Sequence, residues 1–279
     1  MNSYAYYNGD FGKSEDIKIP LSDRSIYFGD AVYDAAIGRY EFIMWENEHI
    51  DRFLANAKRL GIEHSYTKRR LSALLCEIAV KSCIPEYFLY FQLSRNKERR
   101  IHSGLGCSSN LLVTIEPIEI NSSLPPLRLS LFEDLRYGYC DIKTVNLLPA
   151  VLASTNAECD GCDEAVFHMG GVVTECAKSN ISILKNGILK THPTTNRILP
   201  GIARRHVLLA CKRLGIPYRE EAFTVEELFA ADEILVSSTT KLCRRANMLC
   251  GQRVGMNDGA RAEKICRFLY DKFENLGEK

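Results

Sequence analysis

The most informative segment of this chain is Cys140-Asp141-Ile142-Lys143-Thr144-Val145-Asn146-Leu147-Leu148. In it, Lys143 stands between apolar Ile142 and Val145. A lysine held in such surroundings is partly desolvated, which favours the neutral amine that Schiff-base chemistry requires. By itself, however, the segment fits a surface lysine at the start of a helix better, so its interpretation depends on the rest of the chain.

The composition is that of an ordinary globular protein. Its 279 residues suit two modest domains. With 36 basic and 35 acidic side chains, the net charge of +1 gives no reason to expect binding to nucleic acid or to a membrane surface. The start of the chain lacks the layout of a signal peptide, and no apolar run is long enough to span a bilayer. We therefore expect a cytoplasmic enzyme.

The cysteines predict neither disulfides nor a metal site. There are 11 of them, and several, such as Cys76, Cys83, Cys211 and Cys266, lie inside apolar patterns typical of small buried hydrophobic residues. Cys159 and Cys162 form a C-x-x-C pair without a second pair at zinc-ribbon spacing, so we expect no zinc. A redox role for this pair is only weakly indicated, because it ends a predicted helix.

Hydrophobic periodicity and turn signals predict a mixture of helices and strands. Helices are expected over residues 49–61, 71–79, 145–157, 201–214 and 260–273, with another opening at the capping box that begins at Thr224. Pro149 has to lie in the first turn of its helix. Strands are expected over residues 39–45, 87–93, 111–118, 127–132, 164–168, 171–174, 181–184, 188–190 and 233–238.

This order of elements predicts two domains of the α/β (α+β) class. We expect a small N-terminal α/β domain over residues 1–120 and a linker over residues 121–127, where two prolines follow turn-forming residues. A larger domain built on a strand meander, with a barrel-like sheet, should then occupy residues 128–279.

The segment around Lys143 closely resembles the cofactor-lysine segment of D-amino-acid aminotransferases. These belong to the class IV aminotransferases, enzymes of fold type IV that use pyridoxal 5'-phosphate and that also include branched-chain aminotransferases and aminodeoxychorismate lyase. The resemblance covers almost the whole chain. Further motifs match in the same order, namely Asp23-Arg24 to Phe28-Gly29-Asp30-Ala31-Val32-Tyr33, His49-Ile50-Asp51-Arg52, Thr174-Glu175, Gly201-Ile202 and Ser237-Ser238-Thr239-Thr240.

The resemblance implies a role for each matching residue. Lys143 would carry the cofactor as a Schiff base and shuttle the proton, while Glu175 would meet the pyridine nitrogen and keep it protonated. Arg52 would bind the phosphate, because its planar fork matches phosphate oxygens. The other residues implied in cofactor binding are Asn180, Leu199, Ile202, Ala203, Ser238 and Thr239.

The resemblance also implies the substrate. Arg100-Ile101-His102 matches an Arg-x-His pair that, with a tyrosine matched by Tyr33, captures the substrate α-carboxylate. In the family this loop comes from the neighbouring subunit, which implies a homodimer with a shared active site. The implied reaction is ping-pong transfer of an amino group from a D-amino acid, such as D-alanine, to 2-oxoglutarate.

Three departures from the family pattern qualify this interpretation. Ala203 stands where the family usually has threonine, so one phosphate hydroxyl is missing. Lys178 is an unexpected cation that would either point into solvent or reshape substrate preference. Arg244 and Arg245 replace apolar residues and could favour a dicarboxylate or another substrate.

Several alternatives stay open at the level of sequence. On the same fold, the chain could be an aminodeoxychorismate lyase or a branched-chain L-amino-acid aminotransferase. From a different class, it could be a non-catalytic protein that binds pyridoxal phosphate or another phosphate. The presence of both Lys143 and Glu175 counts against this last alternative, because a phosphate binder needs neither.

Overall fold

The computed structural model describes residues 3–97 and 99–278. Its internal contacts divide the chain into two compact units. The N-terminal unit comprises Met1–Glu119 with Ile142–Asn146 and Asn275–Lys279, and the C-terminal unit comprises Ile120–Asp141 with Leu147–Glu274. The predicted C-terminal domain included residues 142–146 and 275–279, whereas this division assigns them to the N-terminal unit.

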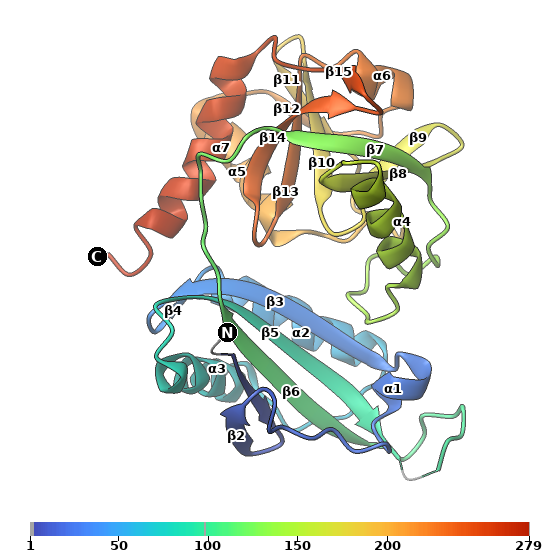
Figure 1. The fold of residues 1–279 in the computed structure, drawn as a ribbon, viewed down its shortest axis with the longest axis vertical. Helices are drawn as coiled ribbons and strands as arrows, with labels where there is room; N and C mark the ends of the chain where they lie inside the picture. The colour runs from blue at the N-terminus through green and yellow to red at the C-terminus, as the bar shows by residue number, and fades with distance from the viewer. Residues whose placement is uncertain (1–2, 98, 279) are drawn as a thin grey trace. The chain divides into compact units, whose positions relative to one another are not determined.

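The N-terminal unit is one antiparallel sheet with helices on it (Figure 1). Its strands follow the order β2-β1-β6-β5-β3-β4. Its elements are β1 (Tyr4–Tyr7), β2 (Asp10–Lys13), α1 (Arg24–Phe28), β3 (Ala31–Arg39), β4 (Phe42–Ile43), α2 (Glu46–Arg59), α3 (Lys68–Ser82), β5 (Glu86–Asn96) and β6 (Ser108–Pro117).

Alternation and helical spacing explain the core of this unit. In β5, Tyr87, Leu89 and Phe91 are fully buried and alternate with less buried residues, as expected for a strand with two different faces. In α2, Ile50 and Phe53 are one turn apart and fully buried, and they pack into the same apolar cluster as β5. The helix thus covers the sheet with a face that also includes two buried polar residues, His49 and Asn56.

The C-terminal unit is built on a curled nine-stranded sheet with the order β12-β11-β10-β13-β14-β7-β8-β9, to which β15 adds by pairing with β14. Helices α5 and α7 pack on each other and on β13 and β14 (Figure 1). Its elements are β7 (Leu127–Glu133), α4 (Leu148–Cys159), β8 (Glu164–Met169), β9 (Val172–Cys176), β10 (Asn180–Lys185), β11 (Ile188–Thr191), α5 (Ile202–Leu214), β12 (Tyr218–Glu220), α6 (Val225–Phe229), β13 (Glu233–Ser238), β14 (Leu242–Leu249), β15 (Gln252–Arg253) and α7 (Gly259–Glu274).

The predicted capping box is present in this unit. The Thr224 side chain accepts a hydrogen bond from the amide of Glu227, and the Glu227 side chain accepts one from the amide of Thr224. These reciprocal bonds satisfy two backbone donors that a helix start would otherwise leave open. The mixed α/β architecture and the curled sheet confirm the predicted fold class.

Two predicted elements are wrong in their extent. The strand expected over residues 39–45 is interrupted, because Tyr40 and Trp45 have positive φ angles of 54° and 53°, which break a strand. The helix expected to begin at Val145 begins at Leu148, with Pro149 in its first turn as predicted. Val145 lies in a bend before the helix, and its amide donates to the carbonyl of Ala31.

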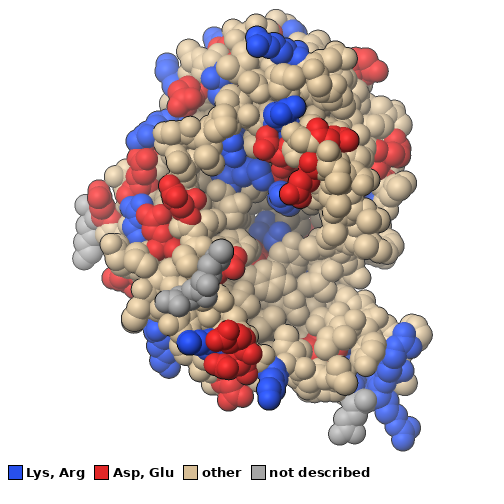
Figure 2. Space-filling model, in the orientation of Figure 1, with Lys and Arg blue, Asp and Glu red and all other residues tan. Residues whose placement is uncertain are grey.

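Charge and hydropathy in the structure agree with the composition. Figure 2 shows acidic and basic side chains interspersed over one face, in line with a net charge of +1. Within the described ranges, no helix is both long and apolar enough to cross a bilayer. No group of three or more potential ligand side chains for a metal ion occurs in that part of the chain either.

Candidate active site

The Lys143 segment is held against β3 by one isolated bridge and by backbone hydrogen bonds. Thr144 forms an antiparallel bridge with Val32, and the amide of Tyr33 donates to the carbonyl of Lys143 over 2.9 Å. Ile142 is 6% exposed and belongs to the core of the N-terminal unit. Backbone pairing and a buried neighbour therefore fix the backbone of Lys143 on both sides.

The side chain of Lys143 lies over an aromatic ring. Its Nζ is 4.4 Å from the centroid of the Tyr33 ring, within the range of a cation–π contact. The Tyr33 ring in turn stacks on Tyr90, with 5.1 Å between centroids, and burial raises the pKa of Tyr90. Two predicted site residues, Lys143 and Tyr33, are thus brought together.

Arg52, the predicted phosphate ligand, forms a fork with Asp34. Its Nε and Nη2 donate to the two carboxylate oxygens, both over 2.8 Å. His49 lies 2.8 Å from the same carboxylate through Nδ1, and the Asp34 side chain is fully buried. A guanidinium has five N–H donors, so this fork orients Arg52 without using all of its donors.

The two partners of Asp34 control its ionisation. Burial raises the pKa of Asp34, but Arg52 and His49 outweigh burial and hold that pKa well below its ordinary value. Burial lowers the pKa of His49, an effect that Asp34 opposes and that the charges of Arg52 and Lys143 reinforce. Nε2 of His49 is buried and has no hydrogen-bond partner among the described residues.

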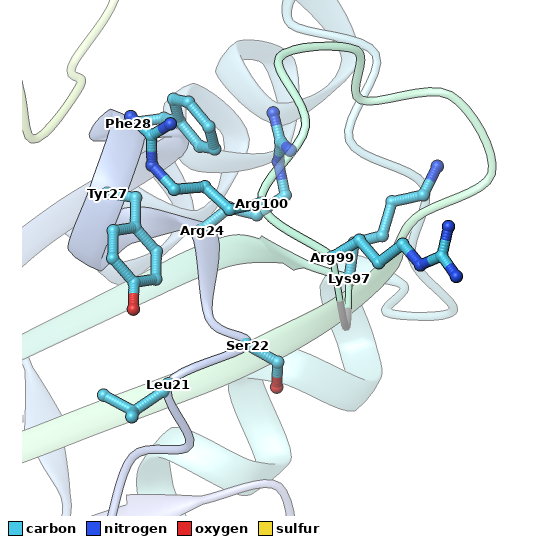
Figure 3. Close-up of a pocket in the computed structure, with 8 residues that line it drawn as sticks. All are labelled: Leu21, Ser22, Arg24, Tyr27, Phe28, Lys97, Arg99 and Arg100. Carbon is cyan, nitrogen blue, oxygen red and sulfur yellow. The ribbon is translucent and has the colours of Figure 1, made fainter.

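Arg100 and His102 lie in the exposed loop that joins β5 to β6. The Arg100 guanidinium is 5.0 Å from the centroid of the Phe28 ring and 5.7 Å from that of Tyr27. Arg100, Tyr27 and Phe28 line a pocket together with Arg24 (Figure 3). Neither Arg100 nor His102 uses its side chain in a hydrogen bond or ion pair within the part of the chain that the structure describes.

Glu175 is the polar centre of the C-terminal unit. It is 5% exposed, and its Oε2 accepts hydrogen bonds from the side-chain amide of Asn180 over 2.8 Å and from the backbone amide of Leu199 over 3.0 Å. Its Oε1 forms an ion pair with Arg136 over 2.5 Å. Three predicted cofactor residues, Glu175, Asn180 and Leu199, are therefore joined by direct hydrogen bonds.

Sequence reasoning missed Arg136. Besides Glu175, its guanidinium binds both oxygens of Asp134 over 2.9 and 2.8 Å and lies 4.7 Å from the centroid of the Phe167 ring. These carboxylates raise the pKa of Arg136, although burial opposes them. The position follows β7 in a loop without a local pattern, so only the acidic residues at Asp134 and Glu175 could have suggested a buried basic partner.

Helix α5 begins after a glycine that cannot cap it with a side chain and that packs tightly against Asn180. Gly201, the N-cap, has no side chain to bond the first amides, and Ile202 and Ala203 behind it are 6% and 3% exposed. A Cβ on Gly201 would lie 1.8 Å from Oδ1 of Asn180. Glycine is therefore required here by packing, and the helix start offers backbone donors in a site shaped by Asn180.

Ser238 and Thr239 stand at the end of β13, where both are half-buried. Oγ of Ser238 accepts a hydrogen bond from the amide of Lys241 over 3.2 Å, which closes the turn into β14. The side chain of Lys241 forms an ion pair with the buried Glu164 over 2.8 Å. This pair anchors the turn that presents the two hydroxyl residues.

The unexpected cations have different surroundings. Lys178 is exposed, which fits the first of its two predicted alternatives. Arg245 binds both oxygens of the buried Glu233 over 3.0 and 2.8 Å, whereas Arg244 donates to the carbonyl of Pro125. Because Arg245 is held in a structural ion pair, the structure argues against the hypothesis that it recognises a dicarboxylate.

The cysteines are free thiols. Cys211 and Cys266 are buried as expected, but Cys83, the C-cap of α3 with a φ of 55°, is exposed. Cys159 is the last residue of α4, as predicted. Burial raises the pKa of Cys162, which disfavours the reactive thiolate.

Comparisons with known proteins identify the family. A sequence model of the amino-transferase class IV family matches residues 31–248. A D-alanine aminotransferase of Staphylococcus epidermidis is 33% identical over 273 residues, which cover 96% of each chain. A D-alanine aminotransferase of Listeria monocytogenes is 36% identical over 243 residues, 84% of this chain and 83% of the relative.

Solved structures share the fold. The branched-chain aminotransferase of the archaeon Thermoproteus uzoniensis superposes with a TM-score of 0.88 at 23% identity, covering 98% of this chain and 96% of that one. The branched-chain amino acid aminotransferase of Escherichia coli gives a TM-score of 0.89 at 21% identity, covering 100% and 97%. At these identities the likeness concerns the fold.

This chain belongs to the class IV aminotransferases. It is therefore a pyridoxal-phosphate-dependent transaminase, as the resemblance of its motifs implied. The residues present suit that cofactor. The C-terminal unit offers a buried carboxylate at Glu175 and open amides behind Gly201, and the N-terminal unit offers an amine at Lys143 and a guanidinium at Arg52.

Proposed function

We propose that this aminotransferase moves the amino group of a D-amino acid, such as D-alanine, to 2-oxoglutarate. The observation that carries the proposal is the Arg100-Ile101-His102 loop, whose two cationic or hydrogen-donating side chains are exposed and make no polar contact within the described chain. Such a pair, with the phenol of Tyr33, suits a carboxylate. The identity with D-alanine aminotransferases over most of the chain supports the same choice.

We also propose how the chain holds its cofactor. The guanidinium of Arg52, oriented by Asp34, and the amides of Ile202 and Ala203 would bind the phosphate, because both present N–H donors to an anion. Glu175 would accept a hydrogen bond from the pyridine nitrogen, and Asn180 and Leu199 hold that carboxylate in place. The roles proposed for the remaining positions are ring packing for Leu199 and phosphate contacts for Ser238 and Thr239.

Lys143 is the proposed acid and base. Pyridoxal phosphate, when bound, supplies an electron-accepting ring next to the substrate α-carbon. The amine of Lys143 would remove the α-proton of the substrate and return a proton later in the same half-reaction. One group would therefore perform both proton transfers. Its contact with the Tyr33 ring restricts where Nζ can move. Since donor and acceptor use the site in turn, the kinetics should be ping-pong.

A substrate panel tests this proposal. Purified enzyme is assayed with D- and L-forms of alanine, glutamate, aspartate and leucine as donors and 2-oxoglutarate as acceptor. We expect D-alanine to have a higher kcat/KM than L-alanine and L-leucine, with parallel double-reciprocal lines. Preference for L-leucine would instead identify a branched-chain aminotransferase, and release of 4-aminobenzoate from aminodeoxychorismate would identify the lyase.

The assembly is proposed on chemical grounds. We infer a homodimer in which the Arg100 loop of one subunit serves the other, as in the family that the motifs resemble. Helix α4 supplies a candidate contact surface for this dimer, since Leu148, Val151 and Leu152 are 64%, 54% and 56% exposed while Ala150 and Ala153 are buried. A helix that is apolar on both sides normally packs on both sides.

The cytoplasmic location stays a prediction.

A further inference from the structure

Arg24 is a buried arginine in α1 that the proposed mechanism does not use. It is 4% exposed, and its Nε donates to Oδ2 of Asp30 over 2.7 Å. Its Nη1 donates to the carbonyl of Ile101 over 2.5 Å and its Nη2 to the carbonyl of His102 over 2.8 Å. One guanidinium therefore bonds two consecutive backbone carbonyls of the substrate-recognition loop, 77 and 78 residues further along the chain.

Asp30 connects Arg24 to a second arginine. Its Oδ1 accepts from Nη1 of Arg95, a residue of β5, while its Oδ2 takes Arg24. A Cβ on Gly104 would lie 3.0 Å from Cδ of Arg95, so Arg95 packs closely under the other end of the same loop. One carboxylate, whose side chain is 14% exposed, thus fixes two arginines, one at each end of the segment from residue 101 to residue 104.

The ring of Phe28 adds a third point of attachment. The guanidinium carbons of Arg24 and Arg100 lie 4.5 and 5.0 Å from its centroid (Figure 3). The centroid of the His102 ring lies 5.2 Å from that of Phe28. In the close-up, the Arg24 side chain extends along Phe28, whereas that of Arg99 points away from it. Both proposed carboxylate-binding side chains therefore contact the same ring that Arg24 covers.

Helix α1 itself is firmly attached to the sheet. Its N-cap, Asp23, accepts hydrogen bonds from Tyr7, Ser94 and Asn110 over 3.0, 2.7 and 2.8 Å. Arg24 is the next residue, so its backbone cannot shift without breaking this cluster. Its guanidinium is accordingly a rigid support, and not a flexible surface group.

We propose that Arg24 is a positioning residue for substrate carboxylate recognition, acting through the backbone carbonyls of Ile101 and His102. The inference rests on the proposed function of Arg100 and His102. Bidentate recognition of a carboxylate requires donors held to within about 0.5 Å, and an exposed loop does not hold them without a support of this kind. Arg24 touches no substrate; it sets the geometry of the residues that do.

The first test separates substrate binding from turnover. In Arg24→Met holoenzyme we expect KM for D-alanine to rise about tenfold or more, the effect of losing a hydrogen bond to a charged group. The kcat and the cofactor absorbance should stay near the wild-type values, because carboxylate binding contributes equally to ground and transition states. Arg39→Met, which removes an arginine paired with Glu86 in the same unit, should leave KM unchanged. Unchanged KM in Arg24→Met would overturn the proposal.

A double-mutant cycle separates this proposal from the function it rests on. If Arg24 acts through the loop, Arg24→Met should raise KM much less in an Arg100→Met background than in the wild type. Full additivity would show that Arg24 acts elsewhere and would overturn the inference. If Arg100→Met alone leaves KM unchanged, the proposed role of Arg100 fails, whatever Arg24 does.

A third measurement guards against a variant that does not fold. Arg24→Lys keeps the charge toward Asp30 but cannot donate to two carbonyls and a carboxylate in the same geometry. We expect faster amide hydrogen exchange over residues 99–105 in Arg24→Lys, with exchange in β3 and β5 unchanged. Equal rates of amide exchange over residues 99–105 in the wild type and in Arg24→Lys would overturn the proposal.

Discussion

The side-chain amine of Lys143 lies over an aromatic ring. The ring of Tyr33 lies 4.4 Å from Nζ, and the chain around the lysine is pinned to β3 by a bridge and a hydrogen bond. A freely rotating lysine would lose considerable side-chain entropy on reaching a single reactive position. Part of that cost is already met in the folded chain, which suits the proposed role of Lys143 as nucleophile, acid and base in turn.

Replacement of Lys143 should abolish the chemistry without unfolding the protein. In Lys143→Ala we expect loss of the long-wavelength absorbance of the bound cofactor and a fall in kcat/KM of about 10³-fold or more, since both nucleophile and proton carrier are lost. Lys81→Ala, at an exposed lysine paired with Glu77, serves as control and should behave as the wild type. Retention of the absorbance band in Lys143→Ala would disprove the assignment of the lysine.

The lowered pKa of Asp34 predicts that the folded protein loses stability in acid. Because Arg52 and His49 hold its pKa below the ordinary value, the unfolded chain takes up the proton at a higher pH than the folded one. The stabilisation is complete above the unfolded pKa of about 3.9 and is lost as the pH falls below it toward the folded pKa. The free energy of unfolding, from urea titrations between pH 3 and pH 7, should therefore depend less steeply on pH below about 4 in Asp34→Asn. Asp271→Asn, at a half-exposed carboxylate, is the control and should keep the wild-type slope.

The start of α5 shows how one element can be shaped by another. Gly201 has a φ of −67°, an ordinary value, so its need for glycine comes from Asn180 in β10 and not from backbone strain. The sequence pattern correctly predicted a helix over residues 201–214 that ends at Gly215. It could not predict the contact with Asn180, which joins positions 21 residues apart through the packing of a strand against a helix start.

Gly201→Ala should weaken cofactor binding. The added methyl group would displace Asn180 and with it the hydrogen bonds to Glu175 and to the carbonyl of Leu199. We expect the dissociation constant of pyridoxal phosphate, titrated by absorbance into apoenzyme, to rise about tenfold or more. Gly12→Ala, whose Cβ would be 4.0 Å from Ile17, is the matched control. Equal affinity in both variants would mean that Asn180 is not needed to hold the site.

Across the whole chain, α4 stands out because it is apolar on two sides. Its alanines pack on β7 and β8, while Leu148, Val151 and Leu152 remain exposed in the single chain. Exposed apolar groups gathered on one helix mark a protein–protein contact more often than an ordinary surface. In a two-fold symmetric dimer, any change there counts twice.

Val151→Glu should therefore dissociate the proposed dimer. A buried, unpaired carboxylate at such a contact costs about 3 kcal/mol or more, which is more than about a hundredfold in the dissociation constant. Val80→Glu, at a valine that is 56% exposed on α3, is the matched control and should leave the assembly unchanged. Sedimentation velocity of the wild type and both variants decides the matter, and a wild type that sediments as a monomer would refute the dimer.

The sequence alone was sufficient for the family, the cofactor and the order of most helices and strands, because motifs such as the Lys143 segment and Thr174-Glu175 keep their order and local periodicity sets each element. It was insufficient for Arg136 and Arg24. Arg136 lies in a segment without a recognisable pattern, and Arg24 lies in a matched motif that by itself assigns it no contact. Both bond partners 39 to 78 residues away. Such contacts depend on how sheets and loops pack, and only the tertiary structure decides which buried charge meets which carboxylate or carbonyl.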